Sequence, residues 1–466
     1  MRFLLCLFFL LSLFHQVIGG ARLPVLPRYP SQDEDFYKPP EGNSWKEKPP
    51  GTILRARNVT FASLLYNLPS RAKAYQLLFV TRDVNEKPAT TVTTVVVPVG
   101  ANFNRLLSFQ GAYDSPDIDC SPSYGFRNQV VGSAYVWNQA QLFILGRFPL
   151  TGGPVINIPD YEGSNAAFTV GPQTAYHTLD SIRAALNSQH ITGLNPEANT
   201  ILYGYSGGGL ATEWATEFHS SYAPTLKVIG AAMGGLPTNI TKTYQNVNNG
   251  TFSELNVLAT LGLANAYPKV DAYVKEHLRS DYKKAFFYPR IRCGPQAGID
   301  PQPALSKMNI TAMYDNGDDI LTDFRHILNK VGVMGKHIKE DNTPNFPLYI
   351  WAGTNDDVVR PIADVGALVN KYREMGTKVT YKKWLLQDHI SALILGLGPA
   401  HSWIRNRFAI VEKLDQLDPI LQGDNEDLED LPMDGTEEEV LAEWFDFGSQ
   451  GVLSDEMAAE EQRYEL

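Results

Sequence analysis

The sequence predicts an α/β protein with a mainly parallel central sheet, flanking helices and a helical subdomain inserted into the sheet. Short runs of β-branched and aromatic residues, bounded by Gly, Pro or Asn, are typical of strands buried on both faces. Between these runs, apolar residues recur with the 3.6-residue period of a helix. Strands that alternate with helices indicate a parallel sheet, and a single break in the alternation indicates an insertion.

The composition narrows the class of protein. The chain has 466 residues, of which 44% are hydrophobic and 20% charged, so it can bury a large core. Collagen, a coiled coil and a polytopic membrane protein are excluded. The net charge of -11 argues against nucleic acid as a partner. No internal repeat is present, which argues against a propeller or a solenoid.

The acidity belongs to the C-terminal segment. Residues 418–466 carry 17 acidic residues and one basic residue, whereas the preceding 417 residues carry a net charge of +5. We expect 418–466 to be an acidic, disordered tail. It contains an apolar island of Leu441, Trp444, Phe445 and Phe447. Docking of this island on the inserted helical subdomain or at an apolar entrance of the folded body, and a purely solubilising role of the tail, both stay open.

The N-terminus predicts secretion. Residues 1–21 combine Arg2, an apolar stretch and small residues at 19–21, which is the pattern of a signal peptide. The apolar stretch is shorter than the roughly 20 residues that span a bilayer, so we expect cleavage and no integral membrane segment afterwards. Residues 22–50 contain seven prolines, which favours an extended arm rather than a helix or strand. Four Asn-x-Thr sequons agree with a secreted glycoprotein, at Asn58, Asn239, Asn249 and Asn309.

The core of sheet and helices is expected at 51–236 and 346–417. Its strands are predicted at 92–99, 106–109, 142–145, 155–158, 200–203, 226–232, 348–351 and 379–384. Two helices present apolar faces, one with Ala175, Leu179, Ile182 and Leu186, the other with Ile362, Val365, Leu368, Val369 and Tyr372.

Residues 237–345 interrupt this pattern. Two helical faces occur in this stretch without a convincing strand: Val270, Tyr273, Val274, His277 and Leu278, then Ile320, Phe324, Ile327, Leu328 and Val331. Because the sheet pattern resumes afterwards, we interpret the stretch as a lid; a second domain that covers nothing is the alternative.

The strongest chemical signal is a G-x-S-x-G motif at 204–208. An apolar strand precedes it and a helix-compatible segment follows. The serine of such a motif sits on a sharp turn that leaves no room for neighbouring side chains, so glycines flank it. The turn exposes the hydroxyl of Ser206, and the backbone N–H of Gly207 can stabilise an oxyanion. We therefore predict Ser206 as a nucleophile.

A nucleophilic serine requires a base and a carboxylate that orients the base. In parallel α/β sheets with a G-x-S-x-G turn, these residues follow along the chain in the order Ser, Asp, His, each in a loop after a strand. The loop after 348–351 supplies Asp356 and Asp357, and we favour Asp356 because it lies at the loop apex. Downstream lie His389, directly after a strand, and His401, which follows Gly-Pro and is expected to begin another helix. We favour His389 as the base.

A second oxyanion donor is expected after an early strand. The loop after 106–109 contains Asp114, which could act there as a protonated acid or through its backbone amide. The sequence has no H-E-x-x-H, C-x-x-C or P-loop motif, so no metal and no cofactor are expected.

Residues 50 to 415 resemble the fungal secretory lipase family, the yeast lipase A type, which has the α/β-hydrolase fold. The resemblance rests on six segments: YDS at 113–115, DCSPSY at 119–124, IPDYEG at 158–163, AAFTVG at 166–171, TLDSIRAA at 178–185 and GYSGG at 204–208. It departs from the family in lacking cysteines for a second disulfide and in carrying the acidic tail.

The resemblance implies a catalytic triad of Ser206, Asp356 and His389, with Asp114 and Gly207 as the oxyanion hole. It also implies that the insertion is a lid over an acyl-binding tunnel, and that a disulfide joins Cys120 in the core to Cys293 in the lid. The implied activity is hydrolysis of acylglycerol esters at a lipid–water interface by a secreted lipase, without a cofactor. Three alternatives stay open: a deacetylase of small or secondary-metabolite esters, a serine peptidase, and a catalytically silent binding protein.

Overall fold

The computed structural model describes residues 27–422, apart from 63–68, 129, 131–132, 147, 149–151, 294–304 and 341. The predicted signal peptide and the tail beyond Gln422, including its apolar island, lie outside the described residues. Internal contacts divide the chain into a unit of residues 1–411 and a unit of residues 412–466. The features below belong to the first unit, apart from residues 412–422 at the end of the last helix.

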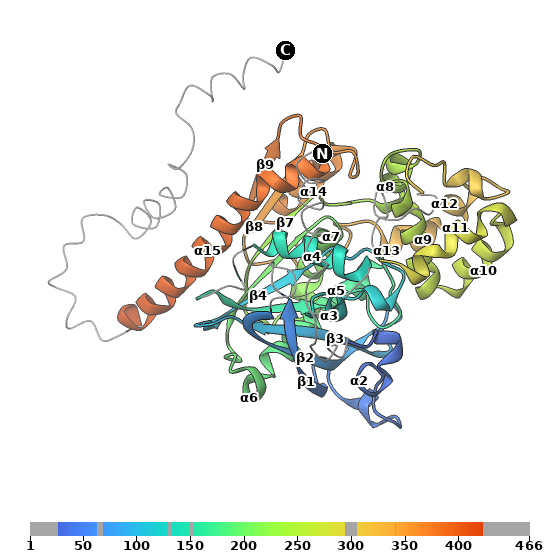
Figure 1. The fold of residues 1–466 in the computed structure, drawn as a ribbon. Coiled ribbons are helices and arrows are strands. Elements are labelled where there is room, and N and C mark those ends of the chain that lie inside the picture. Colours follow the sequence, from blue (N-terminus) through green and yellow to red (C-terminus); the bar gives the residue numbers. More distant parts are fainter. Residues whose placement is uncertain are drawn as a thin grey trace, which may run out of the picture. The chain divides into compact units, whose positions relative to one another are not determined.

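A mixed sheet forms the centre of this unit, and the predicted α/β class is confirmed (Figure 1). Among the described residues it has nine strands in the order β1-β2-β3-β5-β4-β6-β7-β8-β9. The strands from β5 to β9 in this order run parallel, whereas β1, β2 and β3 pair antiparallel at one edge. Their bounds are β1 (Ile53–Ala62), β2 (Pro69–Arg82), β3 (Pro88–Val97), β4 (Asn102–Gln110), β5 (Pro154–Pro159), β6 (Asn199–Tyr205), β7 (Val228–Gly234), β8 (Leu348–Gly353) and β9 (Val379–Trp384).

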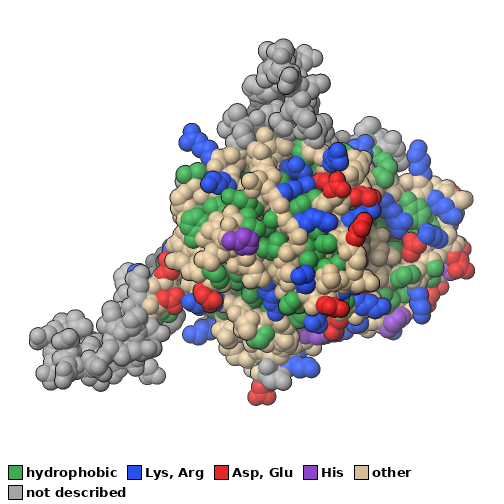
Figure 2. Space-filling view, turned by 90° about the horizontal axis from the view of Figure 1, so that it is seen from below, with side chains coloured by type: hydrophobic (Ala, Val, Ile, Leu, Met, Phe, Trp, Pro, Cys, Tyr) green, Lys and Arg blue, Asp and Glu red, His purple; other side chains and the backbone are tan. Residues whose placement is uncertain are grey.

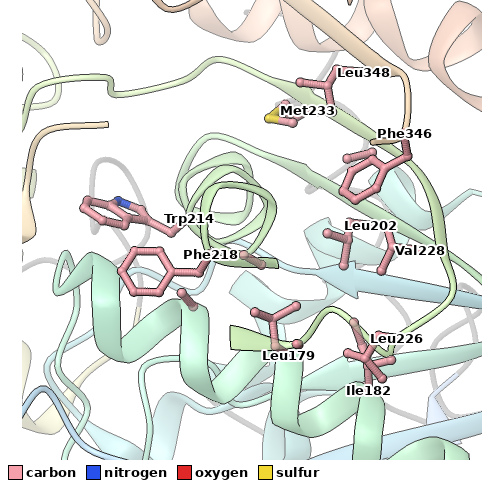
Figure 3. Close-up of a cluster of buried hydrophobic side chains, with 14 of the residues drawn as sticks. Leu179, Ile182, Leu202, Trp214, Phe218, Leu226, Val228, Met233, Phe346 and Leu348 are labelled. Carbon is pink, nitrogen blue, oxygen red and sulfur yellow. The ribbon is translucent and has the colours of Figure 1, made fainter. Parts of the chain in front are cut away.

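Helices cover both faces of the sheet because successive strand residues point to opposite sides. Leu202 packs in a cluster with α5 (Gly171–Leu186), α7 (Gly207–Tyr222) and α14 (Ile362–Glu374). Its neighbour Ile201 packs in a second cluster with α4 (Ser133–Leu145) and α15 (His389–Gln422). Figure 3 shows residues of the first cluster, among them Leu179 of α5, Trp214 and Phe218 of α7 and Leu202 of β6. The short helices α2 (Glu34–Tyr37), α3 (Pro122–Gly125) and α6 (Gln189–Thr192) complete this part.

Helices separate β7 from β8, as the pattern at 237–345 indicated. They are α8 (Ile240–Val247), α9 (Glu254–Ala266), α10 (Pro268–His277), α11 (Lys283–Phe287), α12 (Asp319–Asp323) and α13 (Arg325–Val331). No strand occurs among the described residues of this stretch. The helices share a hydrophobic cluster in which Val257, Val274 and Val331 are fully buried, and which also includes Val84, Ala167 and Val170 from outside the insertion. Figure 1 shows α8 to α12 grouped on one side of the sheet.

A disulfide ties this helical insertion to the sheet region. Cys120 and Cys293 are bonded, with 5.2 Å between their Cα atoms, and both side chains are buried. Cys120 follows the loop that contains Asp114, and Cys293 follows a 3₁₀ turn (Tyr288–Ile291) after α11. The pair that the resemblance implied is therefore present.

Three sequence-based expectations about secondary structure were wrong. Residues 142–145, expected as a strand, form the end of α4, where Leu142 and Leu145 pack against the sheet. The strands β1 and β2 were missed because polar residues alternate along the edge strand β1 and along the first half of β2. His401 does not begin a helix, because α15 continues through Pro399. Proline has no N–H to donate to the carbonyl four residues earlier, and that residue, Leu395, is exposed on the helix surface.

The N-terminal arm also differs from the expected extended chain. It forms α2 and two 3₁₀ turns (Pro30–Gln32 and Ser44–Glu47). Phe36 and Tyr37 of α2 are buried against Leu78 and Val92 of the sheet, and the Tyr37 hydroxyl lies 3.0 Å from Ser123 Oγ. This packing compensates for the lack of a regular hydrogen-bonded strand.

The surface of the described unit mixes charges. Figure 2 shows Lys and Arg side chains spread over one face with Asp and Glu among them. Of the helices that the structure describes, none is long and apolar enough to cross a membrane.

Candidate active site

Ser206 occupies the sharp turn between β6 and α7. Its φ of 57° and ψ of -121° are strained for a residue with a side chain, and such strain is common at active sites. The flanking residues must be glycines because a side chain would not fit. A Cβ on Gly204 would lie 2.2 Å from the Gly208 carbonyl oxygen, and one on Gly208 would lie 1.9 Å from the Gln110 carbonyl oxygen. The strand–turn–helix context that the motif predicted is therefore present.

The three residues implied as a triad meet at the carboxyl edge of the parallel strands. Ser206 follows β6, Asp356 follows β8 and His389 follows β9. His389 Nε2 lies 2.9 Å from Ser206 Oγ, and His389 Nδ1 lies 2.8 Å from Asp356 Oδ2. Asp356 and His389 are buried, at 1% and 4% exposure. The arrangement can move a proton from the serine to the imidazole.

Asp356 is held as an anion by its surroundings. Burial raises the pKa of its carboxyl, but His389 and the backbone N–H groups of Val358 and Val359 lower it more, so that the pKa lies below its usual value. Both N–H groups donate to Asp356 Oδ1 at 2.9 Å. A carboxylate with one oxygen on the backbone and the other on the imidazole fixes the ring orientation.

The two alternatives weighed in the sequence occupy other places. Asp357 is exposed, and its Oδ1 accepts from the backbone N–H of His389 at 3.2 Å rather than from the ring. His401 lies on α15, where its Nε2 is 2.9 Å from the Ile144 carbonyl oxygen and 3.0 Å from the Tyr203 hydroxyl. His401 therefore links α15 to the sheet and to the end of α4.

Tyr205, the variable residue of the G-x-S-x-G motif, also supports His389. Its hydroxyl donates to the His389 carbonyl oxygen at 2.6 Å, and the two ring centroids are 5.0 Å apart. The pattern predicted nothing about this position, because the contact depends on how α15 begins against β6.

Asp114 lies beside the turn that contains Ser206. Its backbone φ is 43°, its side chain is 5% exposed, and Oδ1 has no hydrogen-bond partner. Burial raises the pKa of Asp114 to about 7, and His389 offsets only part of this rise. Gly207 is the first residue of α7, so its N–H has no carbonyl partner within the helix. A protonated Asp114 and the N–H of Gly207 can both donate to one oxyanion.

A buried carboxyl, Glu162, holds the loop that contains Asp114. The Ser115 N–H donates to Glu162 Oε2 at 3.3 Å, and the Glu162 N–H donates to the Tyr113 hydroxyl at 2.7 Å. Glu162 is fully buried, and burial together with Asp114 raises its pKa well above its usual value. In the sequence, Glu162 is part of the IPDYEG segment, and no pattern there predicts a role for it.

An apolar cavity reaches the serine. It is lined by Ser206, Gly207 and Asp114 at one end and by residues of α8 and α9 above them. It encloses about 480 Å³, its opening included, and Val358 and Val359 form one wall. A second cavity of about 430 Å³ shares Ile240, Tyr244 and Ala259 with the first and extends between α9, α12 and α13. Residues of the helical insertion therefore line the cavity that reaches the serine.

The described residues contain no group of three or more His, Cys, Asp or Glu side chains that could hold a metal ion. The geometry around Ser206 consists of side chains and backbone groups of the chain itself.

Comparisons with known proteins agree with this geometry. A model of the family described as secretory lipase matches residues 132–415. Lipase A of Arthroderma benhamiae is 32% identical over 391 residues, which are 81% of this chain and 80% of that protein. A trichothecene C-3 esterase of Fusarium sporotrichioides is 33% identical over 420 residues, 86% of this chain and 89% of that protein.

Among solved structures, Candida antarctica lipase A in its closed state has the same fold. The TM-score is 0.72 at 26% sequence identity, and the match covers 83% of this chain and 87% of that one. The family match spans more than half of the sequence, and both relatives exceed 30% identity over most of it. The chain thus belongs to the secretory lipase family and is a serine ester hydrolase with the α/β-hydrolase fold.

Proposed function

We propose that this chain is a secreted lipase that hydrolyses carboxylic esters of acylglycerols through Ser206, His389 and Asp356. The observation that carries the proposal is the hydrogen-bonded sequence from Ser206 to His389 to Asp356 at the base of an apolar cavity. The lipases among its relatives support the choice of acylglycerols.

In the proposed reaction, His389 takes the proton of Ser206 as the serine oxygen attacks the ester carbonyl. Asp356 stabilises the imidazolium, and the N–H of Gly207 and protonated Asp114 donate to the oxyanion. His389 then protonates the leaving alcohol. Water, activated by His389, cleaves the acyl-enzyme and restores Ser206.

The two cavities are a route for the acyl chain. Ile240, Tyr244 and Ala259 line both, so an acyl group on Ser206 that passes them reaches the second cavity. Ala259 is buried and small, and a larger side chain there would narrow the passage.

Hydrolysis rates for nitrophenyl esters from acetyl to palmitoyl, above and below substrate aggregation, test the proposal. A lipase should hydrolyse long-chain esters faster above aggregation, and Ser206→Ala should abolish all rates. Ala259→Phe should slow palmitoyl hydrolysis at least tenfold and leave acetyl hydrolysis within about twofold. Long-chain rates that are negligible in the wild type would contradict the lipase assignment.

A carboxylesterase or deacetylase of small esters is the second candidate. The similarity to a trichothecene C-3 esterase favours it, since that protein is as similar to this chain as the lipase from Arthroderma benhamiae. A rate that is highest for acetyl esters and unaffected by Ala259→Phe would select this candidate.

Secretion is part of the proposal. The signal peptide lies outside the described residues, but the disulfide and the sequons agree with export. Asn58, Asn249 and Asn309 are exposed and accessible to glycosylation, whereas Asn239 is half-buried and caps α8. Expression of the full chain in yeast should place the protein in the medium with a glycan mass that endoglycosidase removes; retention of an unglycosylated form in the cells would contradict it.

A further inference from the structure

The segment around His389 exposes an unusual number of aliphatic side chains. Leu385 and Leu386, in the loop between β9 and α15, are 74% and 75% exposed. Ile390, Ile394 and Leu395 on the first turns of α15 are 41% to 44% exposed. A single exposed leucine is ordinary, but five such side chains within eleven residues form an apolar surface of the kind that binds a partner.

The loop is held in the conformation that exposes its leucines. Leu386 has a φ of 57°, which costs energy for a residue with a branched side chain. Its N–H donates to Thr354 Oγ1 at 2.8 Å, and the Asn355 N–H donates to the Gln387 carbonyl oxygen at 3.1 Å. The exposure is therefore built into the structure by hydrogen bonds between two loops.

The same contacts join the exposed segment to the substrate cavity. The loop that bonds Leu386 and Gln387 continues through Asp356 to Val358 and Val359, which form a wall of the cavity. Leu385 and Leu386 follow β9 as Ser206 follows β6, so both lie at the carboxyl edge of the parallel strands. A partner bound to the leucines would lie at the same edge as the catalytic serine.

The charges next to the leucines suit an anionic lipid surface. Lys382 and Lys383 are exposed on β9 and point to opposite faces of the sheet. Lys382 lies on the face that α15 covers, with its Nζ 5.3 Å from the Trp384 ring centroid. Two acids also lie nearby: Asp388 Oδ1 accepts from the Ser391 N–H, and Asp357 Oδ1 from the His389 N–H. These hydrogen bonds orient the carboxylates without removing their charge, so the apolar contact is the main contribution to docking. Exposed lysines on an edge strand also discourage pairing with a second copy of the chain.

We propose that Leu385, Leu386, Ile390, Ile394 and Leu395 form the surface that docks this chain on a lipid–water interface, with Lys382 facing anionic headgroups. The proposal rests on the proposed lipase function, because a water-insoluble ester must be reached at such an interface. The leucines insert among the acyl chains, and the cavity wall of Val358 and Val359 then lies close to the lipid.

Binding to vesicles tests the proposal without requiring turnover. The full chain with Ser206→Ala is sedimented with vesicles of phosphatidylcholine, with and without phosphatidylglycerol. Adding Leu385→Ser and Leu386→Asn should weaken binding at least about tenfold, because two leucines no longer enter the hydrocarbon. Asn adopts positive φ more readily than Leu, so Leu386→Asn retains the loop. Val99→Ser, at an exposed valine before β4 on the opposite edge, is the matched control and should change nothing.

Further measurements separate this proposal from the proposed function. In the active chain, the leucine variants should retain the rate on soluble nitrophenyl acetate and lose it on emulsified ester. Loss of both rates would show damage to the site, and unchanged vesicle binding would overturn the docking surface. Binding that requires phosphatidylglycerol, weakens with added salt and is unaffected by the leucine substitutions would also overturn it. So would a wild-type dimer that the leucine substitutions convert to a monomer.

Discussion

The carboxyl group of Asp114 lies directly against the α-carbon of Gly207. A Cβ on Gly207 would lie 1.8 Å from Asp114 Oδ1, closer than any two such atoms can approach. This contact brings the two proposed oxyanion donors to one place: a side-chain acid from the loop after β4 and a backbone N–H from the start of α7. Gly207 is therefore needed for the space that Asp114 occupies as well as for the turn.

Gly207→Ala should lower kcat at least a hundredfold, because the new methyl group displaces Asp114 and with it an oxyanion donor. The protein should still fold, since only the end of one side chain must move. Gly366→Ala is the control: a Cβ on Gly366 in α14 meets nothing within 4 Å, and Ala is the better helix former, so activity should be retained and the unfolding midpoint unchanged or raised. Wild-type kcat in Gly207→Ala would contradict the proposed oxyanion hole.

The pKa of Asp114 predicts a pH dependence of activity. Because burial raises this pKa to about 7, the acid is protonated below about pH 7 and can donate, and it ionises above that pH. Activity should fall toward a tenfold loss per pH unit on the alkaline side. Asp114→Asn keeps a neutral donor and should remove this fall, whereas Asp114→Ala should be slow at every pH. A wild-type alkaline fall that persists in Asp114→Asn would assign it to another group.

The same shift has a consequence for stability. The folded-state pKa is raised above the usual value of 3.8, so the stabilisation of the folded state by the neutral acid is complete below about pH 4. It is lost progressively as the pH rises to about 7. Asp114→Asn should flatten this part of a plot of unfolding free energy against pH.

Asp356 and Asp357 differ in what they contact, which gives a sharp pair of variants. Asp356→Asn should lower kcat by about four orders of magnitude, because an amide no longer holds the imidazole in the required tautomer. Asp357→Asn should lower it only slightly, since Asp357 is exposed and accepts from a backbone N–H. The comparison uses steady-state rates of the two purified proteins on one soluble ester. The reverse ranking would contradict Asp356 as the carboxylate that orients His389.

The sequence was informative where chemistry restricts the residue type. A nucleophilic serine needs glycines at 204 and 208, and the Ser, Asp, His order follows from the topology, so these positions could be named before the structure. From the sequence, the choice between Asp356 and Asp357 rested on loop position alone. In the structure one oxygen of the Asp356 carboxylate lies against the His389 ring, and two backbone N–H groups hold the other oxygen.

Features that depend on packing could not be predicted in this way. The edge strand β1 and the first half of β2 look polar because alternate residues face solvent, and 142–145 looks like a strand because a short apolar run has no clear period. Tyr205 and Glu162 act through contacts with segments far away in the sequence. No local sequence pattern predicts such contacts.

The disulfide predicts a change in stability. Cys120 and Cys293 are separated by 173 positions, and closing a loop of this length restricts the unfolded chain by about 5 kcal/mol in the entropy model. Cys120→Ser combined with Cys293→Ser should lower the free energy of unfolding by an amount up to this value, measured with denaturant. An unchanged free energy would mean that the reduced chain is equally restricted when unfolded.

Glu162 predicts a positioning effect on the oxyanion hole. Glu162→Gln retains a neutral group with an oxygen that accepts from the Ser115 N–H, so kcat should stay within about threefold. Glu162→Ala frees the loop that holds Asp114 and should lower kcat at least tenfold with little change in KM, because the oxyanion exists only in the transition state. Combined with Asp114→Ala, the Glu162→Ala substitution should cost little more than Asp114→Ala alone, since both act through the same donor. A purely structural role would instead give additive losses, and Glu162→Gln would then be as damaging as Glu162→Ala.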